Sequence, residues 1–161
     1  MSNPVADTRE GLPESYLNIA RFCAIECALQ RSGETSVSDM LNAWSYALKC
    51  PRQTPTVAVM TTIGRFVEPG VNHGLRRVNV RVGSDLPPAW HDVPTLIGDL
   101  ARGHRSPEAF FLEFERIHPF EDGNGRTGAI LYNLIKGTLM DPEWPPNYFN
   151  DPRRRPGYGE E

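Results

Sequence analysis

One run of nine residues in the second half of the chain has the composition of a phosphate-binding site. The segment 118–126 reads His-Pro-Phe-Glu-Asp-Gly-Asn-Gly-Arg and precedes a helical pattern. Within it, Gly123, Asn124 and Gly125 can point successive backbone N–H groups into one concavity at the start of that helix. The positive end of the helix dipole reinforces such a site. A phosphate group therefore matches the segment in charge and in shape.

Three side chains of the same segment supply further groups that act on phosphates. Arg126, in the first turn of the expected helix, adds a fixed cationic fork. Asp122 offers a hard oxygen ligand to Mg²⁺, which keeps waters and substrate phosphates in its coordination shell. His118, at the end of the preceding helix, can accept a proton near neutral pH. A base, a metal ligand, an anion site and a cation thus follow one another within nine residues.

Each of these features has a commoner structural explanation when it occurs alone. A histidine at a helix end is usually a cap or a core residue, and a Gly-Asn-Gly sequence is usually a plain turn. An arginine after such a turn is usually a surface charge. Helix capping does not require histidine, acid, glycine pair and arginine in one contiguous order. The combination therefore favours a site that handles phosphate.

Two predicted helices flank this segment. Ser106 is a suitable N-cap and Pro107 fits the first turn of a helix, whose apolar stripe ends at His118. The second helix is expected over residues 126–139, with its apolar residues facing inward. The chemistry is therefore expected between two helices. Four further helices are expected over residues 14–31, 38–49, 56–66 and 94–101.

The segment 75–82 has the pattern of a half-exposed β-strand. It reads Leu-Arg-Arg-Val-Asn-Val-Arg-Val, in which Val78, Val80 and Val82 alternate with polar residues between two flanking glycines. Strict alternation places these valines on one face of a strand. An exposed strand edge can recruit an extended peptide by strand addition.

Length and charge limit the classes of protein to which the chain can belong. Its 161 residues suffice for one domain, expected over 13–149, with flexible ends at 1–12 and 150–161. The net charge of −3 provides no field that would draw the chain to nucleic acid or to an anionic membrane. No apolar stretch is long enough to span a bilayer, and the N-terminus lacks the pattern of a signal peptide. We therefore expect a cytoplasmic protein with no membrane partner.

The cysteines are expected to be buried, reduced thiols. Cys23 and Cys27 lie one helical turn apart in an apolar segment, and Cys50 stands alone. The odd number and the absence of paired CxxC units make a disulfide or a metal site a poor explanation. Trp44 and Trp90 are expected in the core.

The order of residues over 118–126 resembles the signature of the Fic family, His-Pro-Phe-x-Asp/Glu-Gly-Asn-Gly-Arg, without a mismatch. The resemblance extends over about 14–149, and the strand over 76–82 lies where such proteins carry the flap that clamps a target peptide. It implies a mainly α fold, a Fic-type helical bundle with a small β-hairpin flap. The flap residues implied for target binding are Arg76, Arg77, Val78, Asn79 and Val80.

The same resemblance implies a transfer reaction. His118 would deprotonate a Ser, Thr or Tyr hydroxyl of a target protein, which attacks the α-phosphate of ATP or another nucleotide, so that AMP is transferred and pyrophosphate leaves. Asp122 would hold Mg²⁺ on the phosphates, residues 123–125 would cradle the developing charge, and Arg126 would stabilise the leaving phosphates. Phe120 would anchor the loop in the core. The target protein would bind by adding a strand to the flap.

Two features depart from the pattern of adenylylating members of the family. Many of them carry a second arginine three residues after the first, and here that position is Ala129. The donor is therefore open between ATP, UTP and a nucleotide that carries another head group, as in phosphocholine-transferring relatives. Gly125 stands where the related Doc kinases have lysine, which argues against that branch. No Ser/Thr-x-x-x-Glu-Gly/Asn inhibitory motif occurs at either end, so inhibition would come from a separate protein or be absent.

Other interpretations compete with a transferase. The missing second arginine also fits a module that binds a nucleotide or a protein without turnover, although His118 and Asp122 favour an enzyme. Nucleic-acid binding through the arginines of 76–81 and 153–155 rests on charge alone and is not expected. A metal-dependent hydrolase is a still poorer fit, because the spacing of the histidines matches no ligand pattern. Those histidines are His73, His91, His104 and His118.

Overall fold

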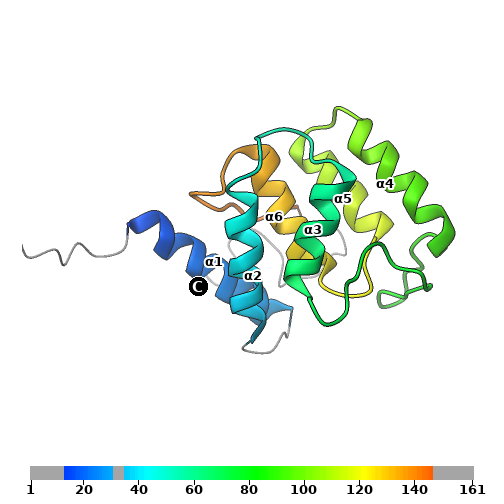
Figure 1. Cartoon of the computed structure of the whole chain (residues 1–161), viewed down its shortest axis with the longest axis horizontal. Coiled ribbons are helices and arrows are strands. Elements are labelled where there is room, and N and C mark those ends of the chain that lie inside the picture. The colour runs from blue at the N-terminus through cyan, green and yellow to red at the C-terminus, as the bar shows by residue number, and fades with distance from the viewer. Residues whose placement is uncertain (1–12, 31–34, 147–161) are drawn as a thin grey trace, which may run out of the picture.

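The computed structural model describes residues 13–30 and 35–146. The segments predicted to be flexible ends, 1–12 and 150–161, lie outside the described residues. Six α-helices and one short 3-10 helix make up the described chain (Figure 1). They are α1 Glu14–Leu29, α2 Thr35–Ala47, α3 Val57–Val67, η1 Trp90–Asp92, α4 Val93–Arg102, α5 Pro107–Ile117 and α6 Asn124–Lys136.

The predicted helices are confirmed, with small shifts in their bounds. Thr56 accepts a hydrogen bond from the backbone N–H of Val59 and thereby caps α3. Ser106 caps α5 in the same way through the N–H of Ala109, and Pro107 occupies the first turn. Helix α2 begins three residues earlier than expected, and α6 begins two residues earlier, inside the Gly-Asn-Gly sequence.

Helix α6 is the centre of the bundle. It packs against α5, α3 and α2, while α1 packs on α2 and α4 packs on α5. In Figure 1, α1 and α4 accordingly lie at opposite ends of the molecule. Every residue of α6 from Asn124 to Leu134 is buried, so the first turn of this helix is enclosed by protein on all sides but its N-terminal end. The segment predicted to bind phosphate therefore leads into a deeply buried helix.

The β-hairpin flap predicted between α3 and α4 is wrong for this structure. No strand occurs in the described residues, and the segment contains a single bridge between Val82 and Asp85. One physical reason lies in the returning arm, where Pro87 and Pro88 have no N–H groups with which to extend a ladder. A second reason is that the guanidinium group of Arg76 donates to the carbonyls of Val78 and Pro88, which lie on the two arms of this segment.

The two tryptophans expected in the core have different positions. Trp44 is buried, and its indole N–H donates to the carbonyl of Leu139. Trp90 is 39% exposed, which corrects the sequence-based expectation for this residue. Across the described part of the chain, no helix combines the length and apolar character needed to cross a membrane.

Candidate active site

His118 lies at the junction between α5 and the loop that leads to α6. It is the C-cap of α5, and its N–H donates to the carbonyl of Phe114 at 2.9 Å. Its backbone is left-handed, with φ 51° and ψ 65°, and it is the one non-glycine residue of the described chain with positive φ. This conformation is unfavourable for a side chain with a Cβ atom. The surrounding structure therefore fixes the point at which the chain turns out of α5.

Phe120 anchors the loop in the hydrophobic core, as predicted. Its ring is fully buried and packs directly on the backbone of α3 at Gly64, where an added Cβ would lie 2.5 Å from the Phe120 Cζ atom. The side-chain amide of Asn124 brackets the backbone of Phe120, because its Oδ1 accepts from the Phe120 N–H and its Nδ2 donates to the Phe120 carbonyl, both at 2.9 Å. The side chain of Asn124 thus shapes the loop and leaves only its backbone N–H for a ligand.

Asn72 joins the loop to the end of α3. Its Nδ2 donates to the carbonyl groups of Gly64 at 3.0 Å and Asp122 at 2.8 Å, and its Oδ1 accepts from the Asp122 N–H at 3.4 Å. The carboxylate of Asp122 accepts the N–H of Gly123 at 2.7 Å. The side chain of Asp122 is nevertheless 63% exposed, so this carboxylate reaches solvent from a fixed backbone.

Gly123 allows α3 and the N-terminus of α6 to approach each other closely. Its φ is 71°, and an added Cβ would lie 2.8 Å from Cγ1 of Val67 and 3.1 Å from Cγ of Glu68. No side chain of the described residues caps α6, so the first N–H groups of this helix have no side-chain acceptor there. The segment predicted to bind an anion is therefore an uncapped helix N-terminus behind a left-handed glycine, a feature that suits an anion.

Arg126 is a buried cation at this helix end. Its side chain is 4% exposed, and its Nη2 lies 2.6 Å from Oε1 of Glu68 and 3.9 Å from Oδ1 of Asp122. Its Nε and Nη1 atoms are also buried and donate to no group of the described residues. Buried donors without an acceptor are rare in proteins and indicate a missing ligand or water. Two donors of the guanidinium group are therefore available to an anion.

The residues predicted to form the target-binding flap do not share one environment. Arg77, Val78 and Asn79 are exposed, and the Asn79 Oδ1 accepts from the N–H of Trp90 at 2.9 Å. Val80 is half-buried. Arg76, in contrast, is 2% exposed, and its role in target binding stays a prediction. Its guanidinium group donates hydrogen bonds to backbone carbonyls of the protein.

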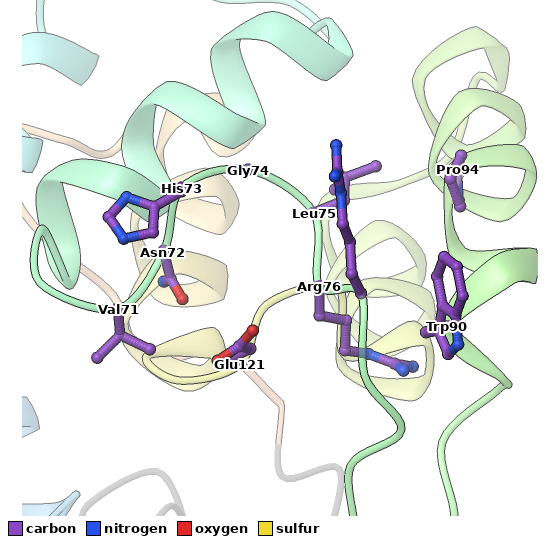
Figure 2. A pocket seen from close by; sticks show the side chains of 10 residues that line it. Val71, Asn72, His73, Gly74, Leu75, Arg76, Trp90, Pro94 and Glu121 are labelled. Carbon is purple, nitrogen blue, oxygen red and sulfur yellow. The ribbon is translucent and has the colours of Figure 1, made fainter.

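A pocket of about 620 Å³ lies beside the loop (Figure 2). In Figure 2, Val71, Asn72 and His73 lie on one side, Trp90 and Pro94 lie on the other, and Glu121 of the loop lies between them. The pocket is mainly apolar, with charged groups at its rim. The lining residues are Val71, Asn72, His73, Gly74, Leu75, Arg76, Arg77, Trp90, Pro94 and Glu121.

Two residues of the site were not identified from the sequence. Glu68 pairs with Arg126, and Asn72 ties the loop to α3. Both belong to the turn after α3, where an acid and an amide are usually ordinary surface residues. Nothing in the sequence therefore distinguished them from surface residues.

The acidic and basic groups of the site do not form a metal centre by themselves. Within the part of the chain that the structure describes, no group of three or more His, Cys, Asp or Glu side chains is placed to hold a metal ion. A hydrolase built on the four histidines therefore finds no support in the geometry. Asp122 can supply one exposed carboxylate to a metal whose other ligands are water and phosphate oxygens.

Comparison with known proteins identifies the family of this segment. Residues 58–135 match the profile of the "Fic/DOC family". The chain is 33% identical over 91 residues to "Protein adenylyltransferase Fic" of Aedes aegypti, a match that covers 50% of this chain and 18% of the relative. The protein of the same name from Drosophila melanogaster shows the same identity and the same coverage. The aligned region is thus less than a fifth of these curated relatives.

A solved structure has the same fold. It is the crystal structure of a Fic family protein from Desulfovibrio desulfuricans G20, with a TM-score of 0.65 and 20% sequence identity over 78% of this chain and 51% of that chain. At this identity the likeness concerns the fold alone. The matched profile contains the whole loop from His118 to Arg126 together with α3 and most of α6. Residues 58–135 of this chain therefore belong to the Fic/DOC family.

Proposed function

We propose that this protein transfers AMP, or another nucleotide-derived phosphate group, from a nucleotide to a Ser, Thr or Tyr hydroxyl of a target protein. The observation that carries the proposal is the state of Arg126, a buried guanidinium group with two donors unmet beside an uncapped helix N-terminus. Such a combination of charge and N–H groups suits a phosphate. The names of the curated relatives, which describe adenylyltransferases, point to the same class of reaction.

The phosphate-binding groups act through fixed geometry. The Asn124 side chain holds the backbone of Phe120, and Asn72 holds that of Asp122, so the loop that leads into residues 123–126 is fixed before a substrate binds. Preorganised donors of this kind stabilise a transition state more than a mobile group does. Positioning and charge stabilisation are the main requirements of phosphoryl transfer.

His118 is the proposed general base. The hydroxyl oxygen of the target forms a bond to the α-phosphorus while the bond from that phosphorus to the bridging oxygen of the β-phosphate breaks. His118 takes the hydroxyl proton, and pyrophosphate leaves with the displaced electron pair. The backbone of His118 is fixed by its bond to Phe114 and by the Arg76 contact to its carbonyl, which supports a constant position for the base.

Mg²⁺ fits this site as an ion held mainly by the substrate. Asp122 would hold it, because its carboxylate is exposed next to the anion site and Mg²⁺ commonly takes one or two carboxylates besides phosphates. When bound, the ion would neutralise part of the phosphate charge.

The identity of the donor nucleotide depends on position 129. Ala129, the position of the second arginine in many adenylylating relatives, is fully buried in the hydrophobic core. This chain therefore has no cation there for a γ-phosphate. ATP is the proposed donor by analogy with the relatives' names, and UTP or a nucleotide with another head group are alternatives that the assay below includes.

The target protein is proposed to bind along residues 77–80. Val78 is 47% exposed, and its neighbours Arg77 and Asn79 are exposed as well. The segment has no partner strand within the described residues, which leaves backbone groups for an added peptide. If the isolated chain transfers no group, a separate inhibitory protein does not explain it; if the chain is inactive only in the presence of a second protein, that protein is the inhibitor.

Transfer from a panel of α-phosphate-labelled nucleotides with Mg²⁺ onto proteins of a cell lysate tests this function. The informative variant is His118→Asn, because asparagine tolerates the left-handed conformation but cannot serve as the base. His104→Asn is the matched control, since His104 is exposed between α4 and α5. We expect label on target proteins with the wild type and the control and none with His118→Asn.

Two results would count against the proposal. Equal labelling by the wild type and His118→Asn would remove His118 as the base. Absence of label with every nucleotide, together with a nucleotide-induced rise in melting temperature, would instead favour a module that binds a nucleotide without turnover. Intact-mass analysis of a labelled target identifies the transferred group.

A further inference from the structure

Arg76 connects three segments of the chain through one side chain and one N–H group. Its backbone N–H donates to the carbonyl of Pro119 at 2.8 Å, and its Nε donates to the carbonyl of His118 at 2.7 Å. Its Nη1 donates to the carbonyl of Val78 at 2.9 Å. Its Nη2 donates to the carbonyls of Pro88 at 2.6 Å and Ile117 at 3.2 Å. The contacts therefore join the end of α5 to both arms of the loop 77–89.

The charge of Arg76 is balanced by carbonyl groups. The residue is 2% exposed, and none of the ion pairs among the described residues includes it. Burial lowers the pKa of its guanidinium group from a value so high that the group remains charged. The carbonyls of Ile117 and His118 form the negative end of the α5 dipole, which favours a cation there. A neutral side chain of similar size would leave these carbonyls without donors.

The hydrogen bond from Arg76 to the His118 carbonyl lies at a residue with an unfavourable backbone conformation. His118 has φ 51°, a conformation that a residue with a Cβ atom adopts only when its surroundings impose it. Arg76 holds the carbonyl of this residue and the carbonyls on either side of it, those of Ile117 and Pro119. Three successive peptide groups are thus fixed by one residue at the point that directs the imidazole.

The same guanidinium group closes the base of the loop 77–89. Val78 lies on the outgoing arm and Pro88 on the returning arm, and both carbonyls bind Arg76. The bond from the Trp90 N–H to Asn79 is a second link between the two arms. These bonds take the place of the β-ladder that the sequence predicted. The position of the loop is therefore set from the end of α5.

We infer that Arg76 is a positioning residue, which holds His118 and the base of the loop 77–89 in one fixed arrangement so that a hydroxyl presented by the loop meets the base. The inference rests on the proposed function for its catalytic consequence. It assigns Arg76 no contact with the substrate. Its effect on the reaction passes through the backbone of His118 and through the two loop arms.

Kinetics of Arg76→Lys and Arg76→Gln test this role. Lysine keeps the charge but cannot reach four carbonyls in the fork geometry of arginine. We expect kcat for transfer to fall by roughly 10- to 100-fold with Arg76→Gln, the loss that follows a displacement of reacting groups by about 1 Å, and to recover in part with Arg76→Lys. The dissociation constant for the Mg²⁺-nucleotide should stay unchanged, because Asn72 and Asn124 hold the phosphate site independently.

Arg102→Gln is the matched control, because it removes an arginine whose ion pair with Asp99 lies on the surface of α4. It should leave both kcat and nucleotide binding unchanged. Wild-type kcat in Arg76→Gln would overturn the inference. A loss of nucleotide affinity as large as the loss of kcat would also overturn it, because Arg76 would then act on the phosphate site.

Hydrogen exchange tests the inference even if the wild type transfers no group. In Arg76→Lys, which keeps the charge and so favours folding, the N–H groups of Trp90 and His118 should exchange faster than in the wild type, while those in the middle of α6 should not change. Equal acceleration throughout the protein would mean that Arg76 contributes only to global stability. Unchanged exchange at Trp90 and His118 would show that neither segment depends on it.

Discussion

The Nη2 atom of Arg126 lies 2.6 Å from Oε1 of Glu68, so the C-cap of α3 is joined to the first turn of α6 beside the loop 118–123. The arginine side of this pair is 4% exposed and the glutamate side 21% exposed. Gly123 permits the contact, because a Cβ at this position would lie 3.1 Å from Cγ of Glu68. The loop is thus held between a buried cation and an acid that reaches solvent.

Glu68→Gln should have opposite effects on folding and on nucleotide binding. The free energy of unfolding should fall by about 1–3 kcal/mol, because the buried charge of Arg126 loses its ionic partner. Affinity for a Mg²⁺-nucleotide should rise, because a carboxylate next to the phosphate site repels the ligand. Urea denaturation and titration calorimetry measure the two quantities.

The control for this variant is Glu113→Gln. Glu113 is 22% exposed, as Glu68 is, but its partner Arg116 is 45% exposed. A surface pair of this kind contributes little to stability, so neither quantity should change appreciably. A lower nucleotide affinity in Glu68→Gln would contradict the expectation and would mean that Glu68 aligns Arg126 for the phosphate.

Asp122→Asn should change the dependence on Mg²⁺ without changing the fold. Asparagine keeps an oxygen that can accept the N–H of Gly123 but lacks the charge that attracts the ion. The free energy of unfolding should stay within about 0.5 kcal/mol of the wild type, as for most exposed substitutions. The Mg²⁺ concentration that gives half-maximal nucleotide binding should rise, and Asp99→Asn on the surface of α4 should leave it unchanged. An unaltered Mg²⁺ titration would remove Asp122 from the ligand set.

The helices on either side of the loop 118–123 could be predicted because their signals are local. Ser106 and Pro107 determine where α5 begins, and the Gly-Asn-Gly sequence determines where α6 begins, through interactions with residues no more than four positions away. The burial of Phe120 was implied by the resemblance to the Fic family, and the structure confirms it.

The role of Arg76 could not be predicted, because its acceptors come from distant parts of the chain. The carbonyls of Ile117 and His118 are 41 and 42 positions away, and the local alternation of valines predicts a strand without indicating these acceptors. The pairing of Arg126 with Glu68 spans 58 positions and leaves no local signal either. Tertiary contacts therefore overrode the local pattern at these residues.

Gly64→Ala should destabilise the protein by about 1–3 kcal/mol, as overpacking of a core generally does. The added Cβ would lie 2.5 Å from Cζ of Phe120, whose ring is fully buried. In an unobstructed helix the same change would be stabilising, so the sign of the effect reports the packing of Phe120 on α3. Gly70→Ala is the control, because nothing lies within 4 Å of a Cβ there. A stabilised Gly64→Ala protein would show that Phe120 does not pack on α3 as described.

The thiols of Cys23 and Cys27 should make the protein less stable in alkaline solution. Burial raises the pKa of Cys23 to about 12 and that of Cys27 to about 11, whereas both ionise near 8.5 in the unfolded chain. The unfolded state therefore gains stability as the pH rises above this lower value. Between pH 8 and pH 10 the free energy of unfolding should fall by roughly 1–2 kcal/mol for each thiol. Urea denaturation at the two pH values, compared between wild type and Cys23→Ala, measures the contribution of Cys23, and an equal pH dependence in both proteins would contradict it.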